Sequence, residues 1–177
     1  RLTKTAPWVH GGRMVDADQR KLCDERAQDR PHVIVAGFGV IGRAVCDRLS
    51  LTDATVTVVE MNVETVRRQR QLGRSIVFGD VSDTEVLENA GIHEAQALVL
   101  TIPDESAVLR ACRTAKAMNP DVFIIARTNF LSRAMVAHNL GANETVVEEM
   151  ATAEKMDALL VRVLEGMQSK KDAASAS

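Results

Sequence analysis

The segment Val33-Ile34-Val35-Ala36-Gly37-Phe38-Gly39-Val40-Ile41-Gly42 decides how this chain folds. Its apolar start predicts a buried strand, and the spacing Gly-x-Gly-x-x-Gly predicts a tight turn into a helix. The first glycine permits the turn, the second lets a ligand approach the backbone, and the third lets the helix pack closely. The helix would begin at Val40 and point its free N–H groups and its positive dipole end at a bound anion, which is typical of a pyrophosphate cradle.

An acidic residue at the end of the next predicted strand supports this interpretation. The run Thr55-Val56-Thr57-Val58-Val59 is rich in β-branched residues and ends at Glu60, 18 positions after Gly42 and close to the roughly 20 expected for a ribose-binding acid. A carboxylate there can accept hydrogen bonds from both ribose hydroxyls and would repel a 2′-phosphate. Glu60 therefore favours NAD(H) or another adenosine nucleotide over NADP(H). The alternative is a solvated glutamate at a strand end with no ligand.

The composition bounds the size and class of the protein. The chain has 177 residues, of which 46% are hydrophobic and 26% are charged, as in one ordinary globular domain with appendages. Its net charge of -2 provides no basic surface for nucleic acid, so no nucleic-acid partner is expected. No apolar run approaches the roughly 18 residues of a membrane span and no signal peptide is evident, so the chain as given is predicted to be soluble.

Two smaller observations concern the first residue and the cysteines. The chain starts with Arg1 rather than Met, which suggests a piece of something longer whose preceding part could include membrane spans. Cys23, Cys46 and Cys112 follow no CxxC or metal-ligand spacing. We interpret them as packing residues in a reducing compartment, and we expect no metal site.

The chain divides into four predicted parts. Residues 1–30 are a linker and an exposed helix over Asp16–Gln28, and Pro31 starts the main domain, residues 31–148. Residues 149–168 belong to a long helix with an apolar stripe, clearest from Glu148 to Glu165. Residues 169–177 are predicted to be a disordered tail because they are Lys, Asp, Ala and Ser with few apolar side chains.

Strands and helices alternate through the main domain. Gly73, Gly91 and Gly141 end three of the helices, and Ser82-Asp83-Thr84-Glu85 is predicted to be a capping box. The predicted strands are His32–Ala36, Thr55–Glu60, Ser75–Phe78, Ala97–Thr101, Val122–Arg127 and Thr145–Val147. The predicted helices are Val40–Leu49, Val63–Leu72, Asp83–Ala90, Glu105–Met118 and Leu131–Asn139.

The strands are almost continuous in Val, Ile and Leu, which predicts a parallel sheet covered by helices on both faces. Six such strands make a Rossmann-like, doubly wound α/β fold with an extra C-terminal helix. Its ligand crevice should lie at the carboxyl ends of the strands, at the switch point beside the first strand. The long helix has two open alternatives, since it could pack back on the sheet or cross to a second subunit.

The chemistry expected of an enzyme is missing from the sequence. There is no Tyr for a Tyr/Lys proton relay, and His10, His32, His93 and His138 stand singly. No GxSxG elbow or GxxxxGK[ST] loop occurs, and the nucleotide fold consumes most of the chain. These observations favour ligand binding over turnover. The alternative is a small NAD-dependent oxidoreductase or the cofactor-binding half of one.

With the strand exits in place, the chain resembles the nucleotide-binding domain that regulates K⁺ transport, known as the RCK N-terminal or KTN (TrkA-N) family. The resemblance covers about residues 31–165. It rests on the glycine segment above, on Val58-Val59-Glu60, on Phe78-Gly79-Asp80-Val81-Ser82-Asp83 and on Gly141-Ala142-Asn143. The third of these is similar to the family's GDATD turn, with Val-Ser where the family often has Ala-Thr. It is the most specific of the four, since ordinary dehydrogenases rarely show it.

The resemblance implies roles for individual residues toward NAD(H), AMP, ADP or ATP. The phosphates would lie on Gly37, Phe38, Gly39, Val40 and Ile41, with Gly42 completing the fingerprint. Glu60 would bind the adenosine ribose, Asp80 and Val81 would meet the adenine, and Thr101 and Ile102 would border the ribose and phosphates. Met61 and Gly79, next to Glu60 and Asp80, would also belong to the nucleotide site. Arg127 would meet a phosphate, and its alternative role is a structural ion pair with a neighbouring helix.

The resemblance also implies a partner and a location. It suggests a non-catalytic ligand sensor attached to a K⁺ channel, a K⁺ transporter or a Kef-type K⁺/H⁺ antiporter, on the cytoplasmic side of an inner (plasma) membrane. The sensor would work as a homodimer or a larger ring. No second ligand domain follows, although many members of the family carry one, and this favours the cytosolic end of an antiporter or channel over a free-standing subunit.

Overall fold

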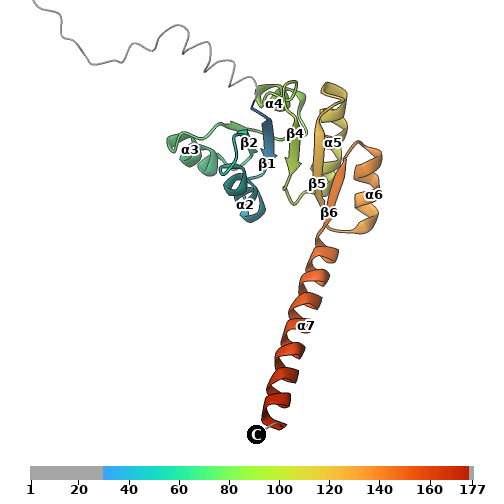
Figure 1. The fold of residues 1–177 in the computed structure, drawn as a ribbon. Helices are drawn as coiled ribbons and strands as arrows, with labels where there is room; N and C mark the ends of the chain where they lie inside the picture. Colours follow the sequence, from blue (N-terminus) through green and yellow to red (C-terminus); the bar gives the residue numbers. More distant parts are fainter. Residues whose placement is uncertain (1–29, 176–177) are drawn as a thin grey trace, which may run out of the picture. The chain divides into compact units, whose positions relative to one another are not determined.

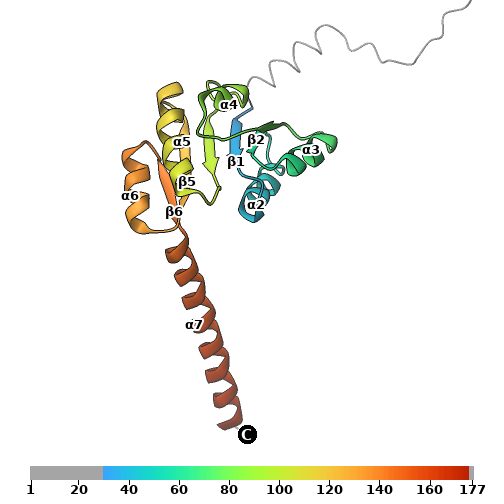
Figure 2. The ribbon, with the colours of Figure 1, turned by 180° about the vertical axis from the view of Figure 1, so that it is seen from behind.

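The computed structural model of the chain describes residues 30–175, with side chains as far as Lys170. The predicted N-terminal linker and the predicted helix Asp16–Gln28 lie outside the described residues. The described part contains an alternating series of six strands and six helices, shown from opposite sides in Figures 1 and 2. The strands are β1 (His32–Ala36), β2 (Thr55–Glu60), β3 (Ile76–Phe78), β4 (Ala97–Leu100), β5 (Phe123–Thr128) and β6 (Glu144–Val147). The helices are α2 (Val40–Leu49), α3 (Val63–Gln71), α4 (Thr84–Asn89), α5 (Glu105–Met118), α6 (Leu131–Asn139) and α7 (Glu148–Ser175).

All six strands form one parallel sheet in the order β3-β2-β1-β4-β5-β6. The chain winds outward from β1 to one edge, returns to β4 beside β1, and winds outward to the other edge. This is the predicted doubly wound, Rossmann-like fold, and the switch point lies between β1 and β4 as expected.

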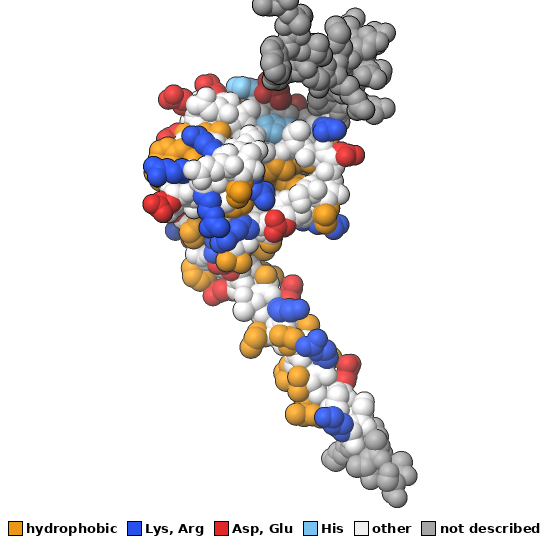
Figure 3. Space-filling view, turned by 90° about the vertical axis from the view of Figure 1, so that its left-hand side faces the viewer, with side chains coloured by type: hydrophobic (Ala, Val, Ile, Leu, Met, Phe, Trp, Pro, Cys, Tyr) orange, Lys and Arg blue, Asp and Glu red, His pale blue; other side chains and the backbone are white. Residues whose placement is uncertain are grey.

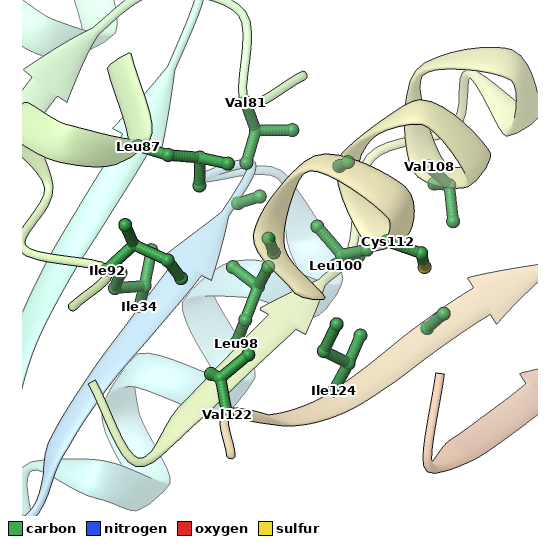
Figure 4. Close-up of a cluster of buried hydrophobic side chains, with 14 of the residues drawn as sticks. Ile34, Val81, Leu87, Ile92, Leu98, Leu100, Val108, Cys112, Val122 and Ile124 are labelled. Carbon is green, nitrogen blue, oxygen red and sulfur yellow. The ribbon is translucent and has the colours of Figure 1, made fainter. Parts of the chain in front are cut away.

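The strands present alternate residues to two separate apolar clusters because side chains of a strand point to opposite faces. Ile34, Leu98 and Ile124 belong to the larger cluster, which α4 and α5 cover with Leu87 and Val108. Figure 4 shows these side chains meeting between the sheet and α5. The second cluster lies on the other face of β1 and β2, where α2 and α3 cover it; its strand members include Val33, Val35 and Val58.

The prediction that helices lie on both faces of the sheet is confirmed, but one face is only partly covered. The α2–α3 face is covered over β1–β3 and left open over β4–β6. Ile125 and Val146 lie in an open groove on that part of the face. Helix α5 packs on the opposite face of β5, behind the strand in Figure 1 and in front of it in Figure 2.

The ends of the elements lie within two residues of the prediction, except at α7. Gly73, Gly91 and Gly141 take positive φ values just after their helices, as the predicted helix ends require. The predicted capping box is wrong, because Asp83 rather than Ser82 occupies the N-cap and its side chain makes no capping bond. The Ser82 N–H instead donates to the Asp80 carboxylate, which draws the turn away from the box geometry.

Helix α7 differs most from prediction. It continues through Ser175, so the predicted disordered tail is wrong for residues 169–175, where Lys, Ala and Asp follow without a glycine or proline to stop the helix. Residues 149–170 are all exposed, which is contrary to the alternative that α7 packs back along the sheet. No helix within residues 30–175 is long and apolar enough to cross a membrane.

Candidate functional site

A cleft of about 620 Å³ opens at the carboxyl ends of the strands, beside the switch point. Every predicted site residue lines it except Phe38 and Gly42. The lining residues are Gly37, Gly39, Val40, Ile41, Val59, Glu60, Met61, Gly79, Asp80, Val81, Thr101, Ile102, Pro103, Asp104, Ala107 and Arg127. The ends of β1 to β5 and the loops after them therefore bring together residues that are up to 90 positions apart in the sequence, from Gly37 to Arg127.

The three positions of the β1–α2 turn are occupied by glycine for different structural reasons. Gly37 has a φ of 92°, a region that favours glycine. A Cβ at Gly42 would lie 1.9 Å from the Gly37 carbonyl oxygen, so the start of α2 fits against the turn only without a side chain. A Cβ at Gly39 would meet nothing within 4 Å. No protein atom among the described residues explains Gly39, which leaves room beside the backbone for a ligand.

Glu60 lies at the floor of the cleft in a fixed orientation. Its Oε2 accepts the Phe38 N–H at 2.7 Å, and its Oε1 accepts the Asn62 N–H at 2.8 Å. Glu60 is therefore not a freely solvated strand-end residue. A carboxylate has about four acceptor positions, so each oxygen can still accept a hydroxyl from a ligand.

Phe38 and Gly42 are buried next to the cleft and do not line it. The Phe38 ring is buried in the apolar cluster under α2 and α3, with the Arg74 guanidinium 5.4 Å from the ring centroid. Its N–H is donated to Glu60 and is not free for a phosphate. Gly42 is buried in the first turn of α2. Both residues act on the cleft through the shape of the β1–α2 turn.

The Gly79-Asp80 turn forms the far wall. Asp80 accepts the Ser82 N–H at 2.8 Å and lies 3.6 Å from the Arg110 guanidinium of α5. The Gly79 N–H donates to the Glu60 carbonyl at 3.1 Å, which ties this turn to the end of β2. A Cβ at Gly79 would lie 2.4 Å from Val86, so the turn needs a glycine to approach α4.

Four lining residues were missed by sequence reasoning, namely Val59, Pro103, Asp104 and Ala107. Asp104 is the N-cap of α5, and its carboxylate accepts N–H groups from Ser106 and Ala107 at 2.9 and 3.1 Å. The signal was available in the sequence, because Pro-Asp before a helical segment is typical of a helix start. Its position after β4 places this helix start at the cleft.

Thr101 and Arg127 close the cleft on the β4–β5 side. The Thr101 hydroxyl donates to the Ala36 carbonyl at 2.8 Å and reaches the Gly37 carbonyl at 3.3 Å, which holds the end of β4 against the glycine turn. Arg127 forms an ion pair with Glu148, Nη2 to Oε1 at 2.7 Å, and this hydrogen bond lowers the pKa of the Glu148 carboxyl. The alternative role stated for Arg127, a structural ion pair with a helix, is therefore present.

A second cavity of about 870 Å³ lies on the open face of β4–β6, between α2 and the first turns of α7. Its walls are mostly apolar, and Ile41, Thr101 and Arg127 line both this groove and the cleft. The remaining groove residues are Val33, Ala44, Val45, Arg48, Leu49, Ala97, Val99, Leu100, Ile125, Val146, Glu148, Ala151, Thr152, Lys155 and Met156. Hydrophobic side chains also lie exposed along α7 beyond it (Figure 3), among them Leu159, Leu160, Val163, Leu164 and Met167.

Comparison with known proteins identifies the family. The sequence profile of the TrkA-N domain matches residues 33–148. The chain is 30% identical over 129 residues to the putative cation/proton antiporter YbaL of Escherichia coli, covering 73% of this chain and 23% of YbaL. It is 30% identical over 117 residues to the putative K⁺ efflux antiporter KefB of Alkalimonas amylolytica, covering 66% of this chain and 18% of KefB. The chain thus spans about a fifth of the length of these relatives.

Solved structures agree with this assignment. The crystal structure of the TrkA-N domain of the inner membrane protein YbaL from Escherichia coli is similar with a TM-score of 0.71 at 30% identity, covering 74% of this chain and 97% of that domain. The C-terminal domain of Kef from Shewanella denitrificans in its AMP-bound form is similar with a TM-score of 0.66 at 25% identity, covering 75% of this chain and 80% of that one.

Proposed function

Because the chain belongs to the TrkA-N domain family, we propose that it is a cytoplasmic regulatory domain of an inner-membrane K⁺ channel, transporter or K⁺/H⁺ antiporter, and that it senses an adenine nucleotide. The observation that carries this proposal is the cleft at the switch point, where the Gly39 backbone is open and the Glu60 carboxylate is held in place. The AMP-bound Kef domain and the antiporter relatives support it.

The cleft suggests a place for each part of the nucleotide. The phosphates would lie over Gly39 at the start of α2, where unpaired N–H groups and the helix dipole favour an anion. The adenosine ribose would bind the remaining acceptor positions of Glu60. Asp80 and Val81 would border the adenine, and Arg127 would meet a phosphate oxygen. The ligand would be NAD(H), AMP, ADP or ATP.

The chemistry of the cleft favours binding without catalysis. Its three carboxylates, Glu60, Asp80 and Asp104, each accept at least one backbone N–H in the described structure. These bonds tie each carboxylate to the backbone of its own loop, which gives all three a structural role at the cleft. An NADH oxidation assay with small carbonyl compounds tests this part, and turnover by the purified chain would contradict it.

A second subunit is part of the proposal. The open groove and the exposed side chains of α7 are two apolar surfaces of the same chain. Apolar surfaces of this kind are typical of sites where another molecule binds. In a symmetric homodimer, α7 of each subunit would lie on the groove of the other subunit. The two-fold symmetry repeats this contact, so both grooves and both α7 helices would be buried. Nucleotide binding would act on the membrane protein by favouring one arrangement of the two subunits over another.

Calorimetric titration tests the proposed ligand class. AMP, ADP, ATP, NAD⁺ and NADH are titrated into the purified chain, and at least one should bind with a Kd below about 1 mM. Gly39→Ala should weaken the tightest of them by at least about tenfold, because the new methyl group enters the space beside the phosphate position. Gly166→Ala in α7 is the matched control, since its Cβ also meets nothing within 4 Å. If no nucleotide binds at millimolar concentration, the proposal is wrong.

A further inference from the structure

Arg127 occupies a position that belongs to two cavities at once. It lies near the end of β5, where it pairs with Val146 of β6, and it lines both the cleft and the groove. Only 18% of the side chain is exposed. Its Nη1 donates to the Thr101 carbonyl at 3.3 Å, while Nη2 lies 2.7 Å from Glu148 Oε1. One guanidinium therefore connects the end of β4, the cleft and the first residue of α7.

Glu148 marks the junction between the sheet and α7. Val147 is the last residue of β6 and pairs with Thr128 of β5, and Glu148 follows it as the first residue of the helix. Residues 149–170 are exposed, so few contacts hold α7 to the described domain beyond this junction. The ion pair from Arg127 is thus a side-chain link between the cleft and the first residue of α7.

The hydrogen bonds of Arg127 are incomplete. Its Nε is buried and has no acceptor in the described part of the chain. Leaving a buried donor unpaired is unfavourable, so an additional acceptor at this place would be stabilising. A guanidinium binds phosphate through two parallel N–H groups, and the side edge formed by Nε and Nη2 is one such pair. On that edge Nε is vacant and Nη2 is held by Glu148.

We propose that Glu148 competes with the ligand's phosphate for Arg127, and that this competition sets the nucleotide affinity and couples occupancy of the cleft to α7. The inference rests on the proposed function. A phosphate that takes both Nε and Nη2 must displace Glu148, which frees the first residue of α7. By linkage, a phosphate weakens the Glu148–Arg127 ion pair by a certain factor, and loss of that ion pair raises the affinity for phosphate-bearing ligands by the same factor.

Phosphate dependence tests the inference. AMP and adenosine are titrated into the wild-type chain, into Glu148→Gln and into Glu149→Gln, a matched control at the next, exposed residue. Glu148→Gln removes the competing charge, so the Kd for AMP should fall about fivefold, the size of a partly exposed ion pair. The Kd for adenosine should not change in either variant, and Glu149→Gln should leave the Kd for AMP at the wild-type value.

Amide hydrogen exchange provides the second readout. AMP should speed exchange at the β6–α7 junction, residues 147–151, in the wild-type chain, and Glu148→Gln should show that faster exchange without AMP. If wild-type protein binds AMP but Glu148→Gln changes neither the Kd nor the exchange, this inference is wrong while the proposed function stands. If Glu148→Gln tightens AMP and adenosine equally, the effect does not involve the phosphate and the inference is also wrong. If the wild-type chain binds no nucleotide, both fail.

Discussion

The two faces of the sheet over β4 and β5 differ in one respect that bears on function. On one face, α5 buries Ala111 and Cys112 completely against strand residues such as Ile124. On the other face, Ala97, Val99 and Ile125 line a groove that no helix of the described chain covers. The first face is covered by α5 of the same chain, and the second stays open although its residues are equally apolar. The comparison teaches that the apolar character of a strand predicts burial but not which molecule provides it.

The cleft repeats this contrast between closed and open surfaces within one turn. Gly42 is surrounded by protein, while Gly39, three residues earlier, faces open space. Both belong to the same fingerprint; Gly42 serves packing, and the open space beside Gly39 is the proposed place of the ligand. Substitutions that are chemically alike at closed and open positions can therefore separate the stability of the domain from its binding.

The largest effect is expected at Gly42. Gly42→Ala places a methyl carbon 1.9 Å from the Gly37 carbonyl oxygen, so the turn and α2 must move apart, at a cost of about 3 kcal/mol in the free energy of unfolding. Gly39→Ala should change that free energy by less than about 0.5 kcal/mol. Urea unfolding measures both. Equal losses of stability would mean that the two glycines are not divided into a closed and an open position.

The second test applies one substitution to the two helices. Ala111→Leu inserts three carbons where α5 has no exposed surface, and it should lower the free energy of unfolding by about 2 kcal/mol. Ala158→Leu in the exposed α7 should leave it within about 0.5 kcal/mol. If thermal or urea unfolding finds Ala158→Leu as harmful as Ala111→Leu, then α7 packs on its own domain and the contrast is lost.

The third test concerns the cover of the open face. Leu160→Asp puts a charge among the exposed apolar residues of α7 and should weaken self-association at least about tenfold without unfolding the domain. Ala158→Asp is the control, because a residue two positions away lies on a different face of the helix. Sedimentation velocity over a concentration series measures the effect. Equal self-association of wild type and Leu160→Asp would contradict the proposal that α7 crosses to a second subunit.

The smallest effect is a pH dependence on the closed side. Burial lowers the pKa of His32 below its usual value of 6.5, opposed by the nearby Glu94. The unfolded chain therefore binds a proton more readily, so the stability from neutral His32 is present above about pH 6.5 and is lost as the pH falls through the folded pKa. Urea unfolding should show that the free energy of unfolding decreases less between pH 7 and pH 5 for His32→Gln than for wild type. His93→Gln, at an exposed position, is the control and should behave as wild type.

Sequence reasoning predicted the fold and most of the cleft because both depend on local patterns. Strand and helix periods, helix-ending glycines and the spacing from Gly42 to Glu60 each act over a few residues. The doubly wound order then places the strand exits together, so Asp80 and Arg127 arrive at the cleft without any long-range signal. The Pro103-Asp104 helix start is a local signal of the same kind that was overlooked.

The remaining features depend on which atoms meet, and no spacing encodes that. The pattern shows an acid at position 60, but not that two backbone N–H groups already bind it. Arg127 was left with two alternative roles, and the structure shows the ion pair with Glu148 at a residue that also lines the cleft. The open groove was missed because apolar strand residues do not tell whether a helix of the same chain covers them.

The most direct test of the central claim is a two-dimensional ¹H–¹⁵N NMR titration of the chain with AMP. If an adenine nucleotide binds at the switch point, the largest amide shift changes will cluster at Gly37 to Ile41, at Glu60 and Met61, and at Gly79 to Val81, and the core of α5 will stay unchanged. Changes confined to the groove or α7, or no saturable change at millimolar AMP, would contradict the account.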